Sequence, residues 1–133
     1  MTDEGVLSMQ MRIGIHQVIE SASLPFGLLP KLPATTLTDF CYKSMFQGCT
    51  SLVTAPALPA TTLANYCYFN MFNGCNKLSS VTCLATNISA TNCTVNWLDG
   101  VAATGTFYKP ESMNYWTRGV SGIPSLWTVE NAP

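Results

Sequence analysis

Charged side chains are scarce in this chain of 133 residues, because Asp, Glu, Lys and Arg together make up 10% of it, against about a quarter of an average domain. The formal net charge is −1, and the basic residues form no cluster. Binding of nucleic acid through a phosphate footprint is therefore not expected. No apolar run approaches the length of a membrane-spanning helix, so no membrane span is predicted.

Residue types that carry familiar enzyme chemistry are also few. The chain has a single histidine, His16, which lies among Ile13, Ile15 and Val18 and is expected to be structural. Most nucleophile–base pairs need a histidine close to a serine or cysteine. No C-x-x-C pair is present to hold zinc, no glycine-rich phosphate loop occurs, and the seven carboxylates are scattered. We therefore predict no enzyme activity, no cofactor and no metal.

An internal repeat is the strongest feature of the chain. Residues 32–57 and 58–83 are two copies of a 26-residue unit, identical at thirteen positions, and residues 84–109 continue the repeat in degenerate form. A fixed period of this length is typical of a solenoid, in which each unit buries its apolar face on its neighbours. The predicted domains are an N-terminal cap or degenerate repeat (1–31), the repeats (32–109) and a C-terminal cap (110–133).

Each unit is expected to contain one short helix. Apolar residues recur every four positions, at Leu37, Cys41, Met45 and Cys49, and such a stripe is typical of an amphipathic helix. We predict this helix over residues 36–49. Thr36 with Asp39 resembles a helix N-cap, and Gly48 and Gly74 stand where a left-handed C-cap would end the helix.

The rest of each unit is expected to be extended. Pro56 and Pro59 exclude a helix between Leu52 and Pro59, so one short strand per unit could pair in parallel along the stack. Residues 105–109 and 127–131 also read as strands, from their alternation and their Thr, Val and aromatic content. Trp116 and Trp127 are expected to cover the end of the stack.

The six cysteines follow the same period, because Cys41, Cys67 and Cys93 share one repeat position, and Cys49 and Cys75 share another. An even number of cysteines is compatible with disulfides, whose pairing spacing alone does not fix. Free cysteine is nevertheless among the most buried residue types. We favour stacked, buried, reduced thiols.

The segments Met45–Leu52 and Met71–Leu78 share the pattern M-F-x-G-C-x-x-L. In both units this pattern is preceded by L-P-A-T-T-L and then by C-Y. The whole unit resembles the BspA-like leucine-rich repeats of bacterial surface proteins, which are abundant in gut Bacteroidales. The resemblance covers about residues 32–133 and implies an α/β fold, a short right-handed leucine-rich-repeat solenoid with one short strand and one short helix per turn and a β-rich C-terminal cap. It also implies adhesion without catalysis.

The sequence leaves more than one cellular location and more than one function possible. The resemblance implies a cell-surface or secreted protein, but the acidic start of the chain, residues 1–4, is unlike a signal peptide. Either the protein is not exported by that route, or the chain is part of a longer one. The leading prediction is a protein-interaction or adhesion module with a protein or glycan ligand. The alternatives are a phage- or mobile-element-encoded structural or inhibitory protein, cytoplasmic or virion-associated, and, third, a carbohydrate-active enzyme.

A partner should contact the positions that differ between units, because packing fixes the shared ones. Outward positions of the predicted helix define this candidate contact face: Thr38, Lys43, Gln47, Ala64, Phe69 and Asn73. Phe69 is the most informative, because an outward aromatic side chain in a polar row is a typical interface anchor. The alternative is that Phe69 lies against a neighbouring turn.

Overall fold

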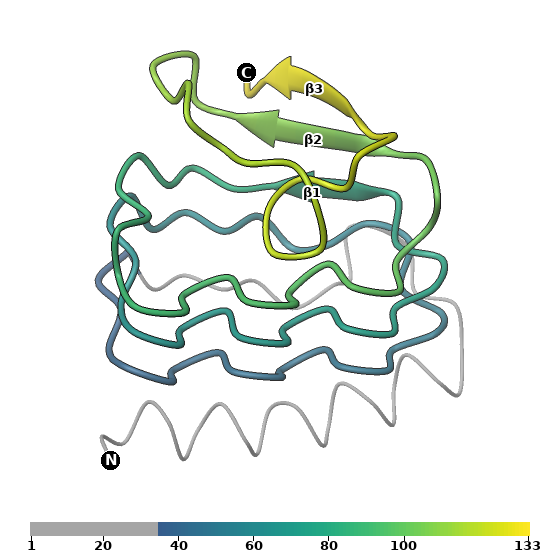
Figure 1. The fold of residues 1–133 in the computed structure, drawn as a ribbon, viewed down its shortest axis with the longest axis horizontal. Helices are drawn as coiled ribbons and strands as arrows, with labels where there is room; N and C mark the ends of the chain where they lie inside the picture. Colours follow the sequence, from purple (N-terminus) through teal and green to yellow (C-terminus); the bar gives the residue numbers. More distant parts are fainter. Residues whose placement is uncertain (1–34) are drawn as a thin grey trace.

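The computed structural model describes residues 35–133, and its stacked coils follow the sequence repeat (Figure 1). One side of each coil is a zigzag of consecutive turns, which we call a turn ribbon. The three turn ribbons span residues 39–48, 65–74 and 91–100, so their starts are 26 residues apart. The other side of each coil is extended. The predicted cap or degenerate repeat at 1–31 lies outside the described residues, and the predicted domain division stays a prediction.

Two sets of backbone hydrogen bonds alternate along the turn ribbons. In the first two ribbons each even-numbered N–H donates to a carbonyl of the next coil, as in the 3.0 Å bond from Phe40 to Asn65. From Cys41 and from Cys67 onward, each odd-numbered N–H donates three residues back within its own coil, as in the 3.2 Å bond from Cys41 to Thr38. Half of the donors therefore build the turns, and the other half join successive coils.

Left-handed backbone recurs at every fourth residue of the turn ribbons. The φ angles there lie between 51° and 80°. The nine positions are Phe40, Ser44, Gly48, Tyr66, Asn70, Gly74, Asn92, Asn96 and Gly100. Seven of them are Gly, Asn or Ser, and Gly and Asn adopt this conformation with little cost. A left-handed residue at each fourth position reverses the direction of the chain and prevents an α-helix.

The predicted helix over residues 36–49 is therefore wrong, and so is the α/β leucine-rich-repeat solenoid with one helix per turn. Residues 35–133 contain no helix, and so none that could cross a membrane. Asp39 caps no helix; its Oδ1 accepts the N–H of Asn65 in the next coil at 3.1 Å. The left-handed conformation expected at Gly48 and Gly74 is present, but it closes a turn ribbon instead of a helix.

The only strands in residues 35–133 are three short parallel ones, β1 (Ser80–Thr82), β2 (Thr106–Lys109) and β3 (Thr128–Asn131), which form one sheet in that order (Figure 1). The pairing of β1 with β2 keeps the 26-residue register, Val81 opposite Phe107. The strands predicted at 105–109 and 127–131 are confirmed as β2 and β3. One strand per unit is wrong for the first unit, whose described residues contribute a single isolated bridge, from Thr54 to Ser80.

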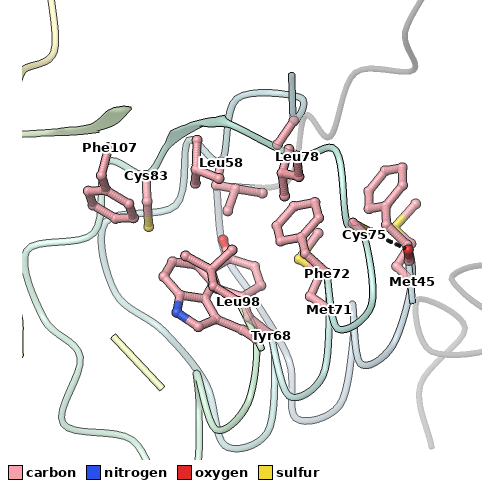
Figure 2. Packing of buried hydrophobic residues seen from close by; sticks show 14 of the residues in the cluster. Met45, Leu58, Tyr68, Met71, Phe72, Cys75, Leu78, Cys83, Leu98 and Phe107 are labelled. Atoms are coloured by element: carbon pink, nitrogen blue, oxygen red, sulfur yellow. Dashed lines mark hydrogen bonds between the residues drawn. The ribbon is translucent and has the colours of Figure 1, made fainter. Parts of the chain in front are cut away.

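Side chains at equivalent repeat positions stack into columns between the turn ribbons and the extended side (Figure 2). Phe46 and Phe72 are fully buried, with ring centroids 5.4 Å apart and planes 10° from parallel. Tyr42 and Tyr68, which also share a repeat position, stack with centroids 6.3 Å apart and planes 12° from parallel. Every coil thus buries its apolar face on the next one, which is the packing that the 26-residue period predicts.

Two tryptophans close the last coil, as predicted. Trp116 stacks on Trp97 with ring centroids 5.5 Å apart, and it meets Phe107 edge-on at 5.2 Å. Trp127 is buried, and its Nε1 donates to the Ala102 carbonyl at 2.8 Å. The aromatic rings replace the apolar face that a further coil would supply.

We predict that Gly74→Val destabilises the protein by at least about 1–2 kcal/mol, because a β-branched residue is strained in left-handed backbone. The φ angle of Gly74 is 80°, and a Cβ there would lie 3.7 Å from the Cα of Gly48 in the coil below. Chemical denaturation measures the loss. Asn96→Gly, also left-handed at φ 54°, is the control and should change stability by less than about 1 kcal/mol. Equal effects of the two substitutions would contradict the strain argument.

Phe72→Ala should lower the free energy of unfolding by about 3–5 kcal/mol, because neighbouring coils held by backbone bonds cannot collapse into the cavity. Met71→Ala should cost about 2–5 kcal/mol for the same reason. Leu126→Ala is the control, since Leu126 is 71% exposed and its truncation should change stability little. Denaturant melts that give all three variants wild-type stability would show that the core has been misplaced.

Candidate functional site

The described thiols are buried among apolar side chains, as predicted, and none forms a disulfide. Burial raises the pKa of Cys67, Cys75, Cys83 and Cys93, to about 12 in the case of Cys83. For Cys75 a side-chain hydrogen bond with Cys49 is the largest cause of the raised pKa, ahead of burial. Because the thiolate is the nucleophile and metal ligand, these side chains are suited to packing and poorly suited to covalent chemistry.

The structure places the six residues of the candidate contact face in the first two turn ribbons or, for Thr38 and Ala64, directly before them. Lys43 is exposed, whereas the other five are half-buried: Thr38, Gln47, Ala64, Phe69 and Asn73. Ala64 packs against the core, so its place on an outward face is not supported. Of the possible pairs, the structure brings Lys43 together with Phe69, whose ring centroid lies 5.4 Å from the Lys43 Nζ.

Two further aromatic residues complete this group, which we call the aromatic–lysine cluster: Phe40, Lys43, Tyr66 and Phe69. Phe40 and Tyr66 stack with centroids 4.8 Å apart and planes 11° from parallel. Tyr66 and Phe69 are 5.5 Å apart and tilted by 47°. Lys43 Nζ lies 5.5 Å from the Phe40 centroid. The four groups therefore form a closed ring of contacts between the first and second coils.

The repeat itself assembles the cluster. Phe40 and Tyr66 share one repeat position, and Lys43 and Phe69 share another, three residues later. Phe40 and Tyr66 are the first left-handed residues of their ribbons, and their N–H groups donate to the next coil at 3.0 Å. These inter-coil bonds set the distance at which the two rings stack.

The cluster combines exposed apolar area with a positive charge. Phe40 is 43% exposed although it is a large apolar residue. No carboxylate among residues 35–133 forms an ion pair with Lys43, whose ammonium instead lies over two aromatic rings. Tyr66 Oη accepts a hydrogen bond from Asn92 Nδ2 in the third coil at 3.0 Å. Such a surface is fitted to contact another molecule and shows no arrangement for acid–base chemistry.

Reasoning from the sequence found Lys43 and Phe69 but missed Phe40 and Tyr66. The helix predicted over residues 36–49 would have turned positions 38, 43 and 47 toward solvent, so these positions were selected. The signal that could have identified the other two residues is an aromatic residue at the same repeat position in both units, one place before Cys41 and Cys67.

Comparison with known proteins gives no relative: no family model, no curated protein and no solved structure matches this chain.

We predict that all six cysteines resist alkylation by iodoacetamide in the folded protein near pH 8, and that all six react after unfolding without reductant. With a pKa of about 12, the Cys83 thiol is about 1 part in 10,000 thiolate at that pH. Mass spectrometry counts the modified residues. Rapid labelling of the native protein, or protection that persists in the unfolded and unreduced chain, would show that the thiols are exposed or bridged.

Proposed function

We propose that this protein is a non-catalytic interaction module, which binds a partner protein through the turn-ribbon side of its coils. The observation that carries the proposal is the aromatic–lysine cluster. Aromatic residues and an exposed cation gather there on a chain with few charges, and aromatic side chains are enriched at the centres of protein interfaces.

The scaffold supports this role. Inter-coil hydrogen bonds hold the backbone on both sides of the cluster, so its side chains are positioned before a partner arrives. A preorganised surface loses less conformational freedom on binding than a flexible one. The M-F-x-G-C-x-x-L resemblance to BspA-like surface proteins favours adhesion as the setting, and this setting stays a prediction.

Binding can be tested with the full chain, labelled and applied to protein and glycan arrays. Phe69→Ser should weaken binding to any protein hit at least about fivefold, because a central aromatic contact commonly contributes 1 kcal/mol or more. Stability should fall by no more than about 1 kcal/mol, the energy of an aromatic pair such as Tyr66–Phe69. Binding is measured by surface plasmon resonance and stability by denaturant melts.

Val53→Ser is the matched control, since Val53 is an exposed apolar residue, 52% accessible, outside the cluster. It should leave binding unchanged. A large loss of stability in Phe69→Ser with unchanged affinity would assign Phe69 to the core and remove the basis of the proposed surface.

A further inference from the structure

Lys43 brings the only cation of the aromatic–lysine cluster, and no carboxylate of the described residues neutralises it. Its Nζ lies 5.5 Å from the centroid of Phe40 and 5.4 Å from that of Phe69, and no carboxylate of residues 35–133 pairs with it. The rings limit the directions that the side chain can take. A lysine restrained in this way is prepared for an anion, because less of its rotamer freedom remains to be lost on binding.

The aromatic rings supply apolar area beside this charge. Phe40 and Tyr66 stack with their planes 11° from parallel at 4.8 Å, so each covers one face of the other. The Lys43 ammonium lies over the Phe40 ring. Because Phe40 is 43% exposed, the cluster offers apolar contact area next to a cation.

Tyr66 supplies a hydrogen-bond donor beside these groups. Its Oη accepts from Asn92 Nδ2 at 3.0 Å, so the hydroxyl hydrogen is available for a second partner. Lys43 contributes three further donors. Each of these is a donor that a carboxylate accepts, and both belong to a cluster of aromatic rings.

From this arrangement, and resting on the function proposed above, we infer that the aromatic–lysine cluster receives a glutamate or aspartate side chain from an acidic, partly apolar segment of the partner protein. Charge complementarity selects the carboxylate, and the exposed aromatic area selects apolar residues beside it.

The test uses two synthetic peptides that differ only in charge, acetyl-Gly-Glu-Leu-Glu-Gly-amide and acetyl-Gly-Gln-Leu-Gln-Gly-amide. Each is titrated into the isotopically labelled full chain at low salt and followed by amide chemical shifts. The glutamate peptide should bind about fivefold more tightly, the ratio expected for an exposed ion pair. The shifts should centre on residues 40–43 and 66–69, and the preference should disappear at high salt.

Three variants assign the preference to Lys43. Lys43→Met keeps the apolar stem and should remove the preference, whereas Lys43→Arg should keep it. Lys77→Met removes an exposed cation outside the cluster and should bind as the wild type does. Melting temperatures within a few degrees of wild type show that each variant is folded.

The inference is overturned if wild-type protein binds neither peptide, if it binds both equally, or if Lys43→Met retains the preference. Lys43-dependent binding to acidic glycans in place of the peptide would also overturn it. If Phe69→Ser abolishes binding to a protein hit while Lys43→Met does not, the proposed function stands and the carboxylate inference alone is wrong.

Discussion

The structure depends on hydrogen bonds that join each turn ribbon to the next. An α-helix uses all its interior N–H groups within the helix, but here every second N–H leaves its coil. Ten such bonds join the first ribbon to the second and the second to the third, with donor–acceptor distances of 2.8–3.0 Å. Left-handed backbone at every fourth residue directs these donors outward. Stacked core columns, stacked glycines and the aromatic–lysine cluster all require this spacing between coils.

Because equivalent residues stack directly, the repeat places like side chains on like. Phe46 lies on Phe72 at 5.4 Å, and the Cys75 Sγ donates to the Phe46 carbonyl at 2.9 Å (Figure 2). At the surface, two side chains at one repeat position also lie next to each other, but they need not be of the same type. Lys43 and Phe69 share one position and meet as a cation and a ring. A repeat that fixes its core residues can thus create a contact between any two side chains placed at one outward position.

The sequence was sufficient to predict four features: the period, the stacking, the buried thiols and the two C-terminal strands. The first three depend on the 26-residue register of the repeat, and the strands depend on the strand preference of their residues. The helix could not be separated from the turn ribbon by apolar spacing. A stripe at Leu37, Cys41, Met45 and Cys49 fits a period of four as well as one of 3.6. Residue propensity was the better guide, since segment 65–74 contains only Met71 among strong helix formers. Two of the four residues of the aromatic–lysine cluster, Lys43 and Phe69, were predicted from the sequence. Phe40 and Tyr66 were missed, because both lie in left-handed backbone that the predicted helix does not contain.

The backbone-to-backbone bonds between the turn ribbons all run the same way, since each of these N–H groups donates toward the C-terminal end of the stack. Aligned peptide dipoles add together, as they do along a helix, and on this side of the molecule the partial positive charge therefore accumulates at the C-terminal end. The closing segment places oxygen atoms there: Leu98 N–H donates to the Val120 carbonyl at 3.2 Å, and Asn96 N–H donates to Ser121 Oγ at 3.0 Å. The stack is thus electrically polar, with ends that are not interchangeable.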